Sequence, residues 1–120
     1  MATKATIDST EALSDAAAIG KALGDPHRLR ALAVLRGREL CVCHLVELFE
    51  LDASTVSRHV GVLRRSGLVA VRKEGRWLHL SRRNADAAIW TVVDELLSKA
   101  PEVEIDADRI HQICSSEECR

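Results

Sequence analysis

Aromatic residues are scarce in this 120-residue chain, which has two Trp, one Phe and no Tyr. The core must therefore be built from Leu, Val, Ile and Ala, and a surface on which single-stranded nucleic acid stacks its bases is disfavoured. No apolar run approaches the roughly 18 residues of a membrane span, and residues 1–14 lack the apolar segment of a secretory signal. We expect a cytoplasmic, single-domain protein without membrane contact, whose four cysteines are reduced thiols.

An excess of positive charge is also missing, since the formal net charge is −1. The charges are nevertheless segregated along the chain. Residues 54–83 carry eight basic side chains against Glu74 alone, a balance of +7, whereas residues 1–53 and 84–120 carry −2 and −6. This segregation predicts one anion-binding face on an otherwise acidic protein.

Capping residues and apolar periodicity predict about five helices. They are expected at about residues 9–23, 26–36, 40–49, 53–66 and 85–98. Asp8, Asp25 and Asp52 are the expected N-caps, and Gly37 and Gly67 the expected stops. The third and fourth helices are separated by only three residues, which is the spacing of a helix-turn-helix.

The periodicity changes after Gly67 to that of β-strands. Residues 68–72 and 77–80 are β-prone, and Glu74-Gly75 between them is typical of a hairpin turn. A hairpin directly after a helix-turn-helix is a wing, so the predicted fold is mainly α with a β-hairpin wing. We expect a disordered segment 1–8, a winged-helix domain 9–100, and an acidic tail 101–120 that contains the cysteines 114 and 119 and a candidate short amphipathic helix near 107–113.

The helix at 53–66 has the features of a DNA-reading element. Val56, Val60 and Leu63 form a stripe that faces the core, with His59 beside it. Arginines and hydroxyls on the other faces are suited to guanine, base edges and phosphates in a major groove. The predicted DNA-binding residues are Ser54, Thr55, Ser57, Arg58, Gly61 and Arg65 on the helix and Arg72, Lys73 and Arg76 on the wing. The histidines at 27, 59 and 79 are interpreted as structural.

Four cysteines form two pairs, Cys41 with Cys43 and Cys114 with Cys119. Thiolates favour soft ions, so all four are candidate ligands of an effector ion. On a regular helix, residues i and i+2 point about 200° apart, so joint ligation by Cys41 and Cys43 is expected to require unwinding of the first helical turn. The spacing is not that of a structural zinc site.

These motifs resemble the arsenic-repressor (ArsR/SmtB) family over about residues 13–98. Residues 39–45, ELCVCHL, resemble its ELCVCDL metal-binding box, and residues 23–30 are similar to its LADPTRLRIL opening. Residues 54–69 resemble its recognition helix and residues 71–80 its wing. The resemblance implies a homodimer, joined through the first and last helices, that binds double-stranded operator DNA and releases it when a toxic metal or metalloid binds.

Two departures from the family pattern concern the effector. His44 replaces the usual Asp of the box, and Val46 stands where the best-known arsenic sensors have a third Cys. Because those sensors hold As(III) or Sb(III) through three thiolates, the resemblance implies that Cys114 or Cys119, from the same or the partner subunit, supplies the third. The family's zinc site is not expected, since the helix at 85–98 has no His.

The preferred interpretation is an arsenite- or antimonite-responsive repressor without a cofactor, in which Cys41, Cys43, Cys114 and Cys119 are the candidate ligands. Alternatives are the same repressor sensing Cd(II) or Pb(II), and a repressor controlled by thiol oxidation. A thiol oxidoreductase is disfavoured because the chain has no C-x-x-C motif and no nucleotide-binding loop, so we do not expect an enzyme.

Overall fold

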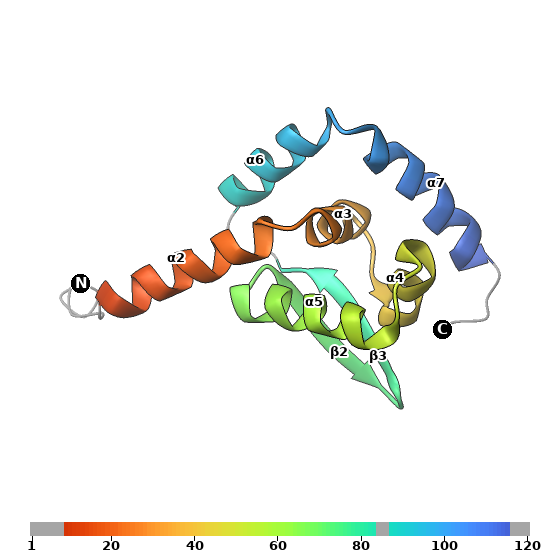
Figure 1. Cartoon of the computed structure of the whole chain (residues 1–120), viewed down its shortest axis with the longest axis horizontal. Helices are drawn as coiled ribbons and strands as arrows, with labels where there is room; N and C mark the ends of the chain where they lie inside the picture. Colours follow the sequence, from red (N-terminus) through yellow and green to blue (C-terminus); the bar gives the residue numbers. More distant parts are fainter. Residues whose placement is uncertain (1–8, 84–86, 116–120) are drawn as a thin grey trace.

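The computed structural model describes residues 9–83 and 87–115 and, within them, six helices and three strands (Figure 1). The elements in chain order are α2 Ser9–Leu23, α3 Pro26–Val34, β1 Leu40–Cys41, α4 Val42–Phe49, α5 Ala53–Ser66, β2 Val69–Glu74, β3 Trp77–Arg82, α6 Ala87–Leu97 and α7 Pro101–Ser115. The predicted fold, mainly α with a hairpin wing after a helix-turn-helix, is confirmed. Among the described helices, none combines the length and apolarity that crossing a membrane requires.

Side-chain capping by Asp25 and Asp52 determines where α3 and α5 begin. The Asp25 carboxylate accepts the N–H groups of His27 at 2.8 Å and Arg28 at 3.1 Å, with Pro26 in the first helical position. Asp52 accepts the Thr55 N–H at 3.2 Å at the start of α5. Gly67 ends α5 with a φ of 83°, a left-handed conformation that glycine adopts without steric cost. The predicted Asp8 cap and residues 84–86 lie outside the described residues.

The wing is a three-stranded antiparallel sheet in the order β1-β3-β2. Leu40 pairs with Leu80 and Cys41 with His79, so these two residues form an edge strand and not the predicted first helical turn. Leu40 is buried beside the fully buried Leu80, and this pairing outweighs the local helical pattern. The turn of the hairpin is at 75–76, one residue later than predicted, because Gly75 is the residue that adopts a positive φ, 60°.

The core is aliphatic, as the composition predicts. Its most buried large side chains include Leu32, Leu35, Leu45, Leu63 and Leu80, each at most 1% exposed. The predicted core stripe of α5 is confirmed, with Val56, Val60 and Leu63 all buried. This stripe fixes which face of α5 remains open to solvent.

The candidate helix at 107–113 is longer than expected, because residues 101–115 form the continuous helix α7. Pro101 occupies the first helical position, and Ile110 and Ile113 are buried where α7 packs on α3 and α4. Asp106 is 2% exposed and accepts two hydrogen bonds from the Arg30 guanidinium, at 2.8 and 2.9 Å. The buried Asp interrupts the apolar periodicity, and its partner is 76 residues away in sequence, so the full length of this helix has no local signal. In Figure 1, α6 and α7 arch over one side of α3, and α5 and the hairpin lie on the other.

Candidate thiolate site and nucleic-acid interface

Cys41 and Cys43 lie together where the wing sheet meets α4. Cys41 is the N-cap of α4 in an extended conformation, with φ −75° and ψ 148°. Its Sγ accepts the N–H of Cys43 at 3.3 Å, and its own N–H donates to His44 Nδ1 at 3.0 Å. The two Sγ atoms are 2.6 Å apart.

This arrangement corrects the prediction that the two side chains point about 200° apart. That angle applies to two residues inside one helix, whereas Cys41 precedes the helix and turns its sulfur back over the first turn. Both sulfurs can therefore meet one atom without any unwinding of α4. Cys41 is 1% exposed and Cys43 is half-buried, so the pair is open to solvent from one side.

Cys41 belongs to two structural units at once. It pairs with His79 of β3, which makes it part of the wing sheet, and it caps α4, the first helix of the helix-turn-helix. A hollow of about 350 Å³ lies beside the two sulfurs. Its walls are Val42 and Val46 of α4, Ala53 of α5 and residues 76–78 of the wing.

The tail cysteines are only partly placed. Cys114 is an exposed residue in the last turn of α7, and partial desolvation raises the pKa of its thiol although the charge of Arg38 opposes this. Helix α7, which carries Cys114, packs on α3 and on α4, the helix that Cys41 caps. Cys119 lies outside the described residues.

A second cluster of metal-binding residue types joins α3 to α5 and consists of Asp25, His27 and His59, with ligand atoms within 4.8 Å of one another. Arg28 donates a hydrogen bond to His59 Nδ1 at 3.0 Å, so Nδ1 must act as an acceptor. The neutral ring then carries its hydrogen on Nε2, which is 4.0 Å from the Asp25 carboxylate, and no lone pair on His59 remains for a metal. Burial holds the pKa of His59 below its ordinary value, which favours this neutral ring.

Arg28 is a structural residue that the sequence analysis missed. Besides His59, its guanidinium donates to the carbonyl of Lys21 at 2.7 Å and to that of Ala22 at 3.2 Å. One side chain thereby joins the end of α2, the start of α3 and the middle of α5. His59 is 31 residues away in sequence, and no local signal pairs them.

The predicted DNA-binding residues belong to α5 and to the hairpin of β2 and β3, which lie side by side in the fold (Figure 1). Seven of them are exposed: Ser54, Ser57, Arg58, Arg65, Arg72, Lys73 and Arg76. Thr55 and Gly61 are half-buried. The guanidinium of Arg65 folds over Gly61, where an added Cβ would be 3.4 Å from one of its nitrogens, so close approach of a ligand at Gly61 requires Arg65 to move.

Two basic side chains of the wing have partners within the protein. Arg72 forms a bidentate ion pair with Glu39, at 2.7 and 3.1 Å, and lies 3.4 Å from Glu74. The hydrogen bond from Arg72 holds the pKa of Glu39 below its usual range. The Arg76 guanidinium lies over the Trp77 ring, 5.0 Å from its centroid, at the edge of the hollow beside the cysteines.

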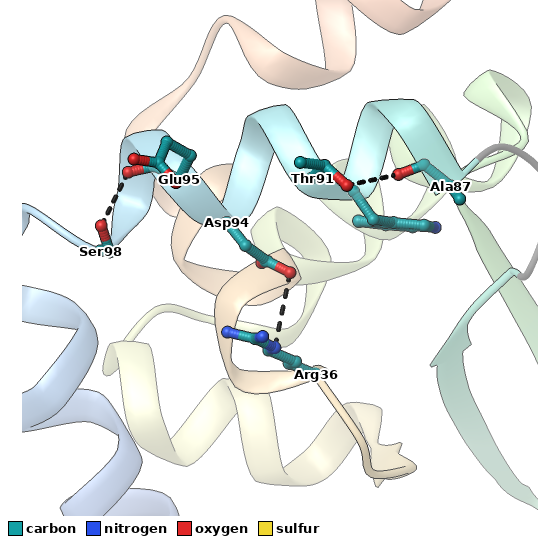
Figure 2. A pocket seen from close by; sticks show the side chains of 7 residues that line it. Arg36, Ala87, Thr91, Asp94, Glu95 and Ser98 are labelled. Carbon is teal, nitrogen blue, oxygen red and sulfur yellow. Dashed lines mark hydrogen bonds and ion pairs between the residues drawn. The ribbon is translucent and has the colours of Figure 1, made fainter.

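A larger hollow, of about 550 Å³, lies on the face of α6 that carries Asp94 and Glu95, and Arg36 also helps to line it (Figure 2). The Asp94 carboxylate accepts hydrogen bonds from Arg82 at 2.7 and 3.0 Å, lies 3.5 Å from Arg36, and therefore has its pKa below the usual range. Arg82 also donates twice to the Leu32 carbonyl, at 2.8 and 3.0 Å. A cation on this face would have to displace arginines from the carboxylate.

Residues 25–71 match the family model described as "Bacterial regulatory protein, arsR family". An uncharacterized HTH-type transcriptional regulator of Methanocaldococcus jannaschii is 40% identical over 68 residues, which cover 56% of this chain and 76% of that protein. The arsenical resistance operon repressor of Escherichia coli is 37% identical over 62% of this chain and 66% of its own length. A cadmium resistance regulatory protein homolog of Staphylococcus aureus is 37% identical over 56% of each chain.

Solved structures agree with these relatives. The homodimeric winged helix-turn-helix DNA-binding domain of a possible ArsR-family regulator from Mycobacterium bovis superimposes with a TM-score of 0.62 at 28% identity. The match covers 78% of this chain and 91% of that domain. The region shared with the Escherichia coli arsenical repressor and the Staphylococcus aureus cadmium regulator spans 66% and 56% of their lengths.

Proposed function

Because the chain belongs to the arsR family of bacterial regulatory proteins, we propose that it is an arsenite- or antimonite-responsive repressor that binds operator DNA as a homodimer. The observation that carries the proposal is the position of Cys41. Its sulfur lies 2.6 Å from that of Cys43, and its backbone belongs to both the wing sheet and the cap of α4. A soft ion held there acts on both DNA-binding elements.

DNA binding is assigned to the open face of α5 and to the wing. Arg58 and Arg65 are exposed on α5, and the +7 balance of residues 54–83 supplies the attraction to phosphate. Two such faces in a dimer enter successive major grooves about 34–36 Å apart. Since each neutralised phosphate releases counterions, the affinity for the operator falls steeply with salt.

Dimerisation is assigned to α2 and α6. Residues 11–17 of α2 are all exposed, including Leu13 at 72%, and a helix segment this short is marginal in water without packing. On α6, Val92 and Leu96 are 57% and 65% exposed. These apolar side chains are the surface that a second copy of the chain covers.

The effector is assigned to Cys41 and Cys43, with a third thiolate from Cys114 or Cys119. Trivalent arsenic and antimony are soft and bind thiolates, and α7, which carries Cys114, packs on α4, the helix that Cys41 caps. To change the ratio of DNA-competent to DNA-incompetent protein from 99:1 to 1:99, the effector must bind the incompetent state more tightly by about 5.5 kcal/mol. Ligation meets this requirement by moving the strand β1 and the cap of α4 together, which changes the angle between wing and recognition helix.

Two other effectors are supported by specific observations. Similarity to a cadmium resistance regulator supports Cd(II), or Pb(II), at the same thiolates. The 2.6 Å separation of the Cys41 and Cys43 sulfurs supports control by thiol oxidation. Under both alternatives the protein still binds operator DNA as a dimer, and only the agent that releases the DNA differs.

The effectors are separated by titrating a complex of the reduced protein and DNA from upstream of its own gene. Fluorescence anisotropy records release by arsenite, antimonite, Cd(II), Pb(II), Zn(II) and peroxide. We expect release at lower concentrations of arsenite and antimonite than of the other agents. Release first by Cd(II) or Pb(II), or only by peroxide, would replace the proposed effector by the corresponding alternative, and failure to bind any upstream DNA would contradict the repressor.

A further inference from the structure

The imidazole of His79 is buried in the wing sheet and has one ring nitrogen without a hydrogen bond. Its side chain is only 9% exposed. Among the residues that the structure describes, Nε2 of His79 is the one buried side-chain nitrogen or oxygen that has no hydrogen-bond partner. Buried polar atoms almost always have a partner, so this nitrogen points to one that the protein itself does not supply.

The nitrogen faces the carboxylate of Glu74. The Oε1 atom of Glu74 lies 3.3 Å from His79 Nε2, yet the contact is not a hydrogen bond. A neutral imidazole that carries its hydrogen on Nδ1 has a lone pair on Nε2, so two electron-rich atoms then face each other. Zinc binds imidazole nitrogen and carboxylate oxygen at about 2.0–2.2 Å, and two such ligands at the tetrahedral angle are about 3.4 Å apart. The observed separation therefore fits two ligands of one cation.

A positive group already lies beside this pair, namely the guanidinium of Arg72. It donates to Glu39 at 2.7 and 3.1 Å and lies 3.4 Å from Glu74 Oε1, the same atom that faces His79. Arg72 is the strand partner of His79, so the two side chains are on the same face of the sheet. The Arg72 side chain is 52% exposed and can turn out into solvent, where a smaller ion of higher charge can replace it between the two carboxylates.

We propose that His79, Glu74 and Glu39 form a site for a divalent first-row cation, Zn(II), Co(II) or Ni(II), which takes the place of the Arg72 guanidinium. Imidazole and carboxylate are ligands that these ions accept, and water completes the coordination. The side chains of Glu74 and Glu39 are 65% and 39% exposed, so the ion reaches the site from solvent and Glu39 is able to turn towards it.

The cation has a consequence for DNA because it displaces Arg72. This arginine belongs to the proposed DNA-binding surface, but Glu39 and Glu74 hold it in the free protein. Once the carboxylates bind the cation, the guanidinium is free to contact phosphate, and operator binding becomes stronger. A cation on the wing thus acts in the opposite direction to an ion at the cysteines. The effect on DNA rests on the proposed function, whereas cation binding does not.

The first test is a Co(II) titration of an untagged full-length variant without thiols, C41S/C43S/C114S/C119S. The thiols are removed because Cys41 is the strand partner of His79 on β1 and thiolates bind the same ions. Visible absorption of the bound ion measures its affinity and its stoichiometry. We expect one Co(II) per chain.

Substitutions in this thiol-free background identify the ligands. His79→Gln and Glu74→Gln should each weaken Co(II) binding at least about tenfold, since even a residue that only orients a ligand contributes this much. Glu74 is exposed, so its variant decides the question if His79→Gln does not fold. His111→Gln, at an exposed position of α7, is the matched control and should leave the affinity unchanged. Arg72→Ala should bind Co(II) more tightly, because it removes the competing positive charge.

The second test measures operator affinity of the same thiol-free protein by fluorescence anisotropy, with and without Co(II). We expect Co(II) to strengthen binding several-fold and to steepen the salt dependence by about one ion, since one more arginine contacts phosphate. Arg72→Ala should bind Co(II) but gain no affinity for the operator. His79→Gln should also show no gain, because it lacks the ion.

The outcomes separate this proposal from the proposed function. Absence of Co(II) binding, or binding that both His79→Gln and Glu74→Gln leave unchanged, would overturn the wing site. Binding at these residues without a gain in operator affinity, or with a gain that persists in Arg72→Ala, would overturn the role of Arg72. If the protein binds no upstream DNA at all, the repressor is contradicted, and the Co(II) titration still decides whether the wing site exists.

Discussion

Asp106→Asn is predicted to loosen α7 from the rest of the protein. The Asp106 side chain is 3% exposed and accepts two hydrogen bonds from Arg30, whose side chain is 29% exposed. Asparagine keeps one acceptor but replaces the other by a donor and removes the charge. A hydrogen bond to a charged group contributes about 1.5–3 kcal/mol, and because Arg30 can rehydrate, we expect a loss of about 2 kcal/mol.

The size of this loss sets the expected measurements. If the protein unfolds as one unit, 2 kcal/mol lowers the thermal midpoint by roughly 8 °C for a domain of this size at a fixed protein concentration. If α7 opens on its own, the midpoint changes little, and amide hydrogen exchange in residues 101–115 accelerates by about 30-fold. Differential scanning calorimetry and hydrogen exchange separate these cases.

Arg109→Gln is the matched control on the same helix. Arg109 pairs with Glu50 at 3.3 Å, but both side chains are largely exposed, at 42% and 74%, so removal of this pair should cost at most about 1 kcal/mol. If Asp106→Asn changes neither the midpoint nor the exchange of α7 by more than this control does, the buried pair does not hold the helix and the reasoning is wrong.

Three further predictions concern DNA binding and pH. Arg58→Ala should weaken operator binding about tenfold or more and lower the slope of affinity against salt concentration by about one ion. Lys99→Ala is the control and should change neither the affinity nor the slope. If anisotropy titrations find the same effect for both variants, Arg58 is not part of the DNA interface. Glu39→Gln should strengthen operator binding several-fold and steepen its salt dependence, because it frees Arg72 for phosphate; unchanged affinity would mean that Arg72 does not reach DNA. Burial lowers the pKa of His59 from 6.5, so its contribution to stability is complete above about pH 6.5 and is lost as the pH falls through the folded-state value. The thermal midpoint of His59→Gln should therefore fall less than that of the wild type between about pH 7.5 and 5.5, and parallel curves would contradict this assignment.

Much of the fold could be predicted because its signals are local. Asp25-Pro26, Asp52 and Gly67 set helix ends through their own backbone and side-chain geometry, and Val56, Val60 and Leu63 share one face by helical periodicity alone. The same holds for the DNA-binding face, which is what remains of α5 once the core stripe is known.

The features that the sequence did not predict depend on partners far away in the chain. The edge strand at 40–41 exists because β3, some 40 residues later, offers it hydrogen bonds, and this pairing also places Cys41 ahead of α4. Helix α7 depends on Arg30 for its buried Asp106. The link from Arg28 to His59 likewise joins two helices with no local signal. Each of these contacts supports the site, so the thiolate geometry was the part least accessible from the sequence.

The central claim is that ligation at Cys41 and Cys43 releases the operator, and the most direct measurement is an arsenite titration of preformed operator complexes of the wild type, Cys41→Ser and Cys43→Ser. Serine is a good N-cap, so Cys41→Ser should preserve the start of α4 and bind the operator with wild-type affinity. The account predicts that both variants stay bound at arsenite concentrations that fully release the wild type. Normal release of either variant would contradict it.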